Sequence, residues 1–204
     1  MTYDRSYHPS MSPYTNGGER KYLCASERER FIKALPVLTN PKDRTYCECI
    51  LMTGCRASEA LGLTALHIDA EEGAIIIRSL KKRNKTHFRA VPVPRSFIER
   101  LDEVHHIRKS RAMPGGGRDC PLWTFSRTTG WLRMKEVMKA AGLSGVKATS
   151  KGLRHSYGVN CALNHVPTVA IKRFLGHSSL QTSEVYLDFA HAEDDRKIVR
   201  RLWG

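Results

Sequence analysis

The stretch KGLRHSYG, residues 151–158, places three cationic or potentially cationic side chains on little more than one helical turn. Lys151 and Arg154 are three residues apart and share a helix face, and Thr149 or Ser150 can cap the helix. Two cations at a helix N-terminus repel one another and oppose the helix macrodipole. A phosphate that docks there would offset this cost, so the stretch indicates an anionic ligand.

The composition of the whole chain supports a polyanionic partner. The 204 residues carry a formal charge of +14, with a pI of about 9.8. The length suggests one domain, or one domain and a tail. So large a basic excess favours nucleic acid first and an anionic membrane second, and the alternative is a solvated basic surface without a partner.

The cysteine pattern indicates neither a zinc site nor a disulfide framework. The only close pair, Cys47 and Cys49, lacks the two-residue gap of zinc knuckles. The sequence shows no signal peptide and no apolar run long enough to span a bilayer. We expect reduced cysteines and a cytoplasmic protein that does not enter a membrane.

The first half of the chain predicts a tail, helices and then strands. Residues 1–20 are polar, and we expect a flexible tail. A helix begins at SERERFIKAL with Ser26 as the expected N-cap, and Gly54 separates two further helices that meet at TGCR. Residues 74–79 and 88–94 read as short strands of an antiparallel hairpin.

The second half returns to helical spacing. Expected helices cover 96–109, a segment that stops at Gly142, and the ranges 151–164, 168–174, 179–189 and 193–202, with a surface loop at 113–121. Ser178 or Ser179 is the expected cap of the helix at 179–189. The predicted fold class is therefore mostly α with a small antiparallel β-sheet (α+β).

Two basic segments in the first half have open interpretations. Arg56 follows TGC and leads a helix, which suits a phosphate site, but an ion pair with Glu59 on the same face is the favoured explanation when Arg56 is taken alone. The lysine-rich turn between the strands could reach into a groove or guard an edge strand. Its basic residues are Lys81, Lys82, Arg83 and Lys85.

The order of these features carries more information than each one alone. His177 follows Gly176 in a turn and Tyr186 lies nine residues later, and neither is specific by itself. Taken together, TGCRASEALGL, LKKRNKTHFRAVPVP, KGLRHSYG and LGHSSLQTSEVY resemble the ordered motifs of the tyrosine recombinases, the phage integrase family. The resemblance covers residues 21–204 and implies the catalytic domain of that family.

The resemblance implies a set of catalytic roles. Tyr186 would attack the scissile phosphate and form a covalent 3′-phosphotyrosine, while Arg56 and Arg154 hold the non-bridging oxygens. Lys81, with Lys82 and Lys85 as competitors, would protonate the leaving 5′-oxygen. His177 would assist through hydrogen bonds.

The same resemblance implies that Glu59 orients the site. It implies neither a metal nor another cofactor, because arginines supply the positive charge and the covalent link conserves the bond energy. Lys82, Arg83, Lys85 and His155 are the further DNA-binding candidates. One departure stands out: Lys151 occupies the place where the family usually has histidine, which leaves any base role there in doubt.

The expected domain organisation is a tail over residues 1–20 and a catalytic domain over 21–204. We expect the N-terminal core-binding domain of typical members to be absent, as in the short fimbrial-switch recombinases or in a truncated product. Expected partners are double-stranded DNA and further copies of the chain in a dimer or tetramer. The expected function is DNA integration, excision or inversion, and the alternative is an inactive DNA-binding or regulatory relative.

Overall fold

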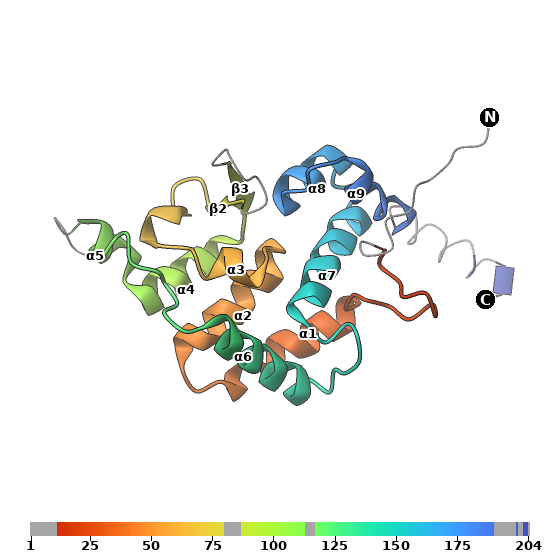
Figure 1. The fold of residues 1–204 in the computed structure, drawn as a ribbon, viewed down its shortest axis with the longest axis horizontal. Coiled ribbons are helices and arrows are strands. Elements are labelled where there is room, and N and C mark those ends of the chain that lie inside the picture. The colour runs from red at the N-terminus through yellow and green to blue at the C-terminus, as the bar shows by residue number, and fades with distance from the viewer. Residues whose placement is uncertain (1–11, 80–86, 113–116, 190–198, 200–201, 204) are drawn as a thin grey trace.

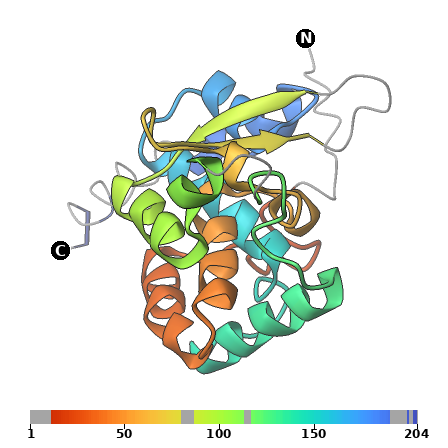
Figure 2. The same ribbon diagram turned by 90° about the vertical axis from the view of Figure 1, so that its left-hand side faces the viewer.

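The computed structural model confirms the expected mixture of helices and a small antiparallel sheet (Figures 1 and 2). It describes residues 12–79, 87–112, 117–189, 199 and 202–203. Helix α2 (Pro41–Thr53) is the centre of the helical body and packs against α4 (Arg95–His105), α6 (Arg127–Ala140) and α7 (Ser150–Leu163). Helix α1 (Ala25–Ala34) covers α6, and the strands lie along one edge of this body.

The start and the end of α2 follow from its local sequence. The Asn40 side chain accepts a hydrogen bond from the backbone N–H of Lys42 at 2.9 Å, and Pro41 occupies the first turn, where no N–H is needed. Gly54 ends the helix with φ 61°, a left-handed conformation that glycine adopts without strain. A short helix, α3 (Ala57–Ala60), starts directly after, so two helices meet at TGCR as expected.

The sheet has the order β1-β2-β3 and is antiparallel throughout. Strands β2 (Ala74–Arg78) and β3 (Phe88–Pro92) lie where the sequence predicts them, and β1 (Ile68–Asp69) adds a short edge that was not expected. Ile77 pairs with Arg89 in the register. Because side chains alternate along a strand, Arg89 and Val91 both point into the protein.

The C-terminal part of the described chain turns back on α7. Helix α8 (Thr168–Leu175) was expected, but the single helix expected at 179–189 was wrong. The segment contains α9 (Gln181–Glu184), whose N-cap is Leu180, and the 3-10 helix η3 (Leu187–Phe189). The backbone N–H groups of Tyr186 and Phe189 bond three residues back, which is the tighter 3-10 pattern.

Helix α1 also starts at a different residue from the one expected. Its N-cap is Cys24 instead of Ser26, and the backbone N–H of Cys24 donates to the Glu27 carboxylate at 2.9 Å. Arg20 and Lys147 bond the same carboxylate, at 3.0 and 2.5 Å. Helix α1 therefore starts two residues earlier than the local pattern suggested, and its capping carboxylate is also bonded from the loop before α7.

The remaining differences are local. His106, with φ 55°, divides the helix expected at 96–109 into α4 and α5 (Ile107–Ala112). Short 3-10 helices connect other elements: η1 (Leu35–Val37) and η2 (Ala65–His67). In the expected tail, residues 12–20 contain a bridge between Tyr14 and Arg20, and the Tyr14 ring stacks on Phe189. The C-terminal helix expected at 193–202 falls mainly outside the described residues.

Candidate active site

Arg56 stands at the N-cap of α3 and is held by a buried carboxylate. Its Nη1 donates to Glu59 Oε1 at 2.8 Å, and its backbone N–H donates to Oε2 at 2.9 Å. The Glu59 side chain is fully buried, whereas 26% of the Arg56 side chain is exposed. The expected ion pair is therefore present, and it leaves part of the guanidinium open to an approaching anion.

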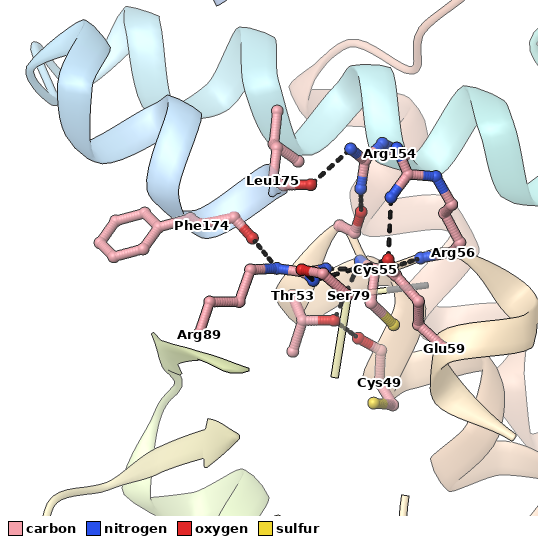
Figure 3. Close-up of polar contacts among 11 residues, drawn as sticks. Cys49, Thr53, Cys55, Arg56, Glu59, Ser79, Arg89, Arg154, Phe174 and Leu175 are labelled. Carbon is pink, nitrogen blue, oxygen red and sulfur yellow. Dashed lines mark hydrogen bonds and ion pairs between the residues drawn. The ribbon is translucent and has the colours of Figure 1, made fainter. Parts of the chain in front are cut away.

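Arg154 lies on α7 with its guanidinium turned toward the end of α2 (Figure 3). Nη1 donates to the Gly54 carbonyl at 2.7 Å, and Nη2 donates to the Leu175 carbonyl at 2.5 Å. Burial and then the charge of Arg56 lower the pKa of Arg154 to about 10, so it remains cationic at neutral pH. The two arginines thus converge from different parts of the chain.

The helix that carries Arg154 begins as the sequence predicts. The Thr149 hydroxyl accepts a hydrogen bond from the Gly152 N–H at 3.0 Å and caps α7. Lys151, in the first turn, is exposed. The pKa of Lys21 is lowered mainly by burial and, to a smaller extent, by the charge of Lys151. Two cations therefore lie near this helix start.

His177 is buried in the turn after α8. Gly176 ends α8 with φ 64°, and the backbone N–H of His177 bonds the Lys172 carbonyl at 3.0 Å. The Nδ1 atom of His177 lies 2.8 Å from Ser183 Oγ, which joins this turn to α9. The bond fixes the orientation of the ring near the segment that leads to Tyr186.

Tyr186 is completely buried between α7 and the turn after α9. Its hydroxyl lies 3.1 Å from Nδ1 of His155. Burial raises the pKa of Tyr186 to about 12, although the charge of Arg154 acts in the opposite direction. The ring also lies against Gly158, where an added Cβ would come within 2.4 Å of Cζ.

The structure thus brings Arg56, Glu59, Arg154 and Tyr186 into one region. His155, considered above as a DNA contact, is 2% exposed and contacts Tyr186 instead of the surface. Four of the basic candidates lie outside the described residues: Lys81, Lys82, Arg83 and Lys85.

Sequence reasoning missed Arg89. Its side chain is 1% exposed and forms an ion pair with Glu59 at 2.7 Å. The strand pattern contained a signal for it, because the alternation of FRAVP puts Arg89 on the same face as the buried Val91. An arginine at an inward position requires an acidic or carbonyl partner.

Two kinds of feature are absent from the described residues. Within them, no cluster of three or more histidine, cysteine or acidic side chains has the arrangement of a metal site. None of their helices has the length and apolar character needed to cross a membrane.

The curated relatives are recombinases. The chain is 27% identical over 194 residues to the tyrosine recombinase XerA of Thermococcus kodakarensis, an alignment covering 90% of this chain and 65% of the relative. It is 29% identical over 183 residues to XerD of Pseudomonas aeruginosa, covering 84% and 58%. The chain therefore spans about three fifths of the length of these relatives.

Solved structures share the fold. The XerH site-specific recombinase bound to its palindromic difH substrate, in a post-cleavage complex, matches with a TM-score of 0.70 and 23% identity, covering 87% of this chain and 52% of that one. The catalytic domain of bacteriophage HP1 integrase matches with a TM-score of 0.61 and 21% identity, covering 86% and 93%. The fold is thus that of a tyrosine recombinase catalytic domain.

The profile of the phage integrase family matches residues 21–193. This match includes all four motifs and every site residue described above, so the chain belongs to the phage integrase family.

Proposed function

We propose that residues 21–204 form the catalytic domain of a site-specific DNA recombinase, which cleaves and rejoins duplex DNA through a 3′-phosphotyrosine. The observation that carries this proposal is the convergence of Arg56 and Arg154, with Arg154 close to Tyr186. Arg154 influences the pKa of the tyrosine, and Arg56 influences that of Arg154. A pair of cations, one of them close to a tyrosine, suits attack on a phosphodiester, because both the phenolate and the transition state are anionic.

The proposed reaction exchanges one phosphate ester for another. The Tyr186 oxygen forms a bond to phosphorus, the bond from phosphorus to the 5′-oxygen breaks, and the phenol proton passes to solvent water. Lys81 donates a proton to the leaving 5′-oxygen, and Arg56 and Arg154 bind the non-bridging oxygens. In the reverse step a 5′-hydroxyl attacks the phosphotyrosine and restores Tyr186. No phosphate ester is lost overall, so the exchange requires no external energy source.

Glu59 and His177 have supporting roles in this proposal. Glu59 orients Arg56 through its two hydrogen bonds. His177 donates to the phosphate or to the nucleophile when DNA is bound. The attack also requires a rearrangement, because Tyr186 is buried here and a duplex phosphate cannot enter the protein interior. We therefore propose that DNA binding moves the turn after α9.

The proposed partners are a duplex and further copies of the chain. The net charge of +14 and the exposed Lys151 support binding to the phosphate backbone. A recombination event exchanges strands between two duplexes, so at least two active sites must cooperate. The proposed localisation is the cytoplasm, in association with DNA.

The test is a covalent trapping experiment. A binding site is first selected from random duplexes, and a nick is then placed in it so that a short fragment diffuses away after cleavage. We expect a complex that survives denaturation and retains a 5′-end label, with a free 5′-hydroxyl on the released fragment. Tyr186→Phe should abolish the complex and Tyr46→Phe, which alters another fully buried tyrosine, should retain it. If the selected site is bound but never linked, the chain is a DNA-binding relative without catalytic activity.

A further inference from the structure

Arg89 is the most deeply buried cation among the ion pairs of the described residues, and four acceptors surround its guanidinium (Figure 3). Nη2 donates to Glu59 Oε2 at 2.7 Å, and Nη1 lies 3.5 Å from Oε1. Nη1 also donates to Ser79 Oγ at 3.0 Å, and Nε donates to the Phe174 carbonyl at 2.8 Å. One side chain of β3 therefore joins α3, the end of β2 and the end of α8.

Each of these acceptors is next to a residue of the proposed active site. Glu59 holds Arg56. The Phe174 carbonyl precedes that of Leu175, which accepts from Arg154, and His177 follows two residues later. Ser79 directly precedes the lysine-rich segment, and its backbone N–H bonds the His87 carbonyl at 2.8 Å on the other side of that segment.

The turn at Gly176 is shaped around the Arg89 guanidinium. A Cβ atom at Gly176 would lie 3.0 Å from Cζ and Nη1 of Arg89, closer than such contacts normally are. The φ of 64° at Gly176 also disfavours other residues. The helix end that presents His177 and the guanidinium therefore fit against each other.

Stability alone is a poor explanation for this arrangement. Removing two charges from water is costly, and a buried ion pair often stabilises a protein no better than an apolar pair of the same size. The pair Arg100–Glu48 shows the ordinary solution, because 47% of the Arg100 side chain stays exposed. Arg89 is instead fully desolvated, and its bonds point at three segments that must keep a fixed geometry.

We propose that Arg89 is a positioning residue for strand cleavage: it sets Arg56 through Glu59, and Arg154 and His177 through the Phe174–His177 turn. The inference rests on the proposed recombinase function. The bond to Ser79 also anchors the base of the lysine-rich segment. Arg89 does not contact the DNA, since its side chain is 1% exposed and its donors are occupied by protein acceptors.

Two measurements on Arg89→Lys and Arg100→Lys test the proposal. Lysine keeps the charge but cannot reach Glu59, Ser79 and Phe174 together, because it lacks the planar fork. The first measurement is the NMR position of the Nε–H signals of Arg56 and Arg154, which needs no DNA. We expect both signals to shift in Arg89→Lys and neither to shift in Arg100→Lys.

The second measurement is single-turnover formation of the covalent complex, with duplex affinity measured in parallel. We expect cleavage by Arg89→Lys to fall at least tenfold with a Kd within about threefold of the unmodified protein, because small displacements of catalytic groups reduce rates steeply. Arg100→Lys should cleave within about twofold of the unmodified rate. Unchanged arginine signals, or equal cleavage rates of the two variants, would overturn the proposal.

A double variant separates positioning from folding. Arg89→Met alone leaves Glu59 buried and unpaired, and Arg89→Met combined with Glu59→Gln removes both charges. The double variant should be more thermally stable than Arg89→Met, but it should not regain the cleavage rate of the unmodified protein. Recovery of both would show that the pair acts only on folding. If the unmodified protein forms no covalent complex, the recombinase proposal fails, and the Nε–H signals still decide whether Arg89 sets the two arginines.

Discussion

The hydroxyl of Tyr186 lies 3.1 Å from Nδ1 of His155, inside the protein and away from any surface that DNA could reach. His155 is adjacent to Arg154 in the sequence, so one residue of α7 contacts the proposed nucleophile and its neighbour is the proposed phosphate ligand. Helix α7 thereby links the position of Tyr186 to that of Arg154.

His155→Phe should release Tyr186 from the interior. The change preserves the approximate size of the ring and removes one hydrogen bond, which is worth about 1 kcal/mol. A loss of that size would raise the population of molecules in which Tyr186 is open to solvent about fivefold. Limited nitration followed by peptide mapping measures that exposure. Tyr46, also fully buried, is the internal control and should stay unreactive. If Tyr186 remains as protected as Tyr46, the hydrogen bond does not hold it.

Gly158→Ala should disturb the same contact from the other side. The added methyl group would overlap the Tyr186 ring at 2.4 Å, and overpacking of this kind costs about 1–3 kcal/mol. Urea unfolding should therefore show a lower midpoint, together with faster nitration of Tyr186. The matched control is Gly62→Ala, where the new Cβ meets nothing closer than 3.6 Å. Equal midpoints for the two variants would argue against tight packing at Gly158.

Stability should fall as the solution becomes more acidic than about pH 6.5. Burial, followed by the charges of Lys151, Arg154 and Lys21, lowers the pKa of His155 to about 4. The unfolded chain takes up a proton near the ordinary histidine pKa, whereas His155 in the folded protein stays neutral until about pH 4. The contribution of His155 to stability is therefore fully present above the ordinary pKa and decreases toward pH 4.

The expected loss from His155 is about 3 kcal/mol over this range. Burial lowers the pKa of His105 to about 4 as well, so part of the slope persists without His155. Urea midpoints at pH 7, 6 and 5 measure the effect. His155→Gln should have a shallower pH dependence than the unmodified protein, and identical slopes would show that His155 is protonated equally in both states.

Lys151→Gln should separate DNA binding from stability. Removing a cation from the first turn of α7 favours the helix by about 0.3–1 kcal/mol, since it relieves the unfavourable interaction with the macrodipole. The same change should reduce the slope of log K against log salt by about 1, if Lys151 contacts one phosphate.

Thermal unfolding and fluorescence anisotropy at several salt concentrations measure the two effects of Lys151→Gln. Lys139→Gln is the control, because Lys139 lies in the last turn of α6, where a cation is favourable. That variant should lose stability slightly and retain the full salt slope. An unchanged slope in Lys151→Gln would remove Lys151 from the DNA-binding surface.

The sequence by itself determined the features that depend on neighbouring residues. Thr149 caps α7, Gly54 ends α2 and the alternation of β3 turns Arg89 inward, because backbone geometry and side-chain period are local properties. The order of the motifs was also sufficient to identify the family, since Arg56, Arg154 and Tyr186 keep their places along the chain.

Only the tertiary structure decided which of these groups meet. Glu59 and Arg89 are 30 residues apart, and His155 and Tyr186 are 31 apart. No local pattern states such a pairing, because a buried polar group bonds whatever acceptor the packing of other elements brings near. At the start of α1, the Glu27 carboxylate that accepts from the Cys24 N–H is also bonded by Lys147, which lies 120 residues away.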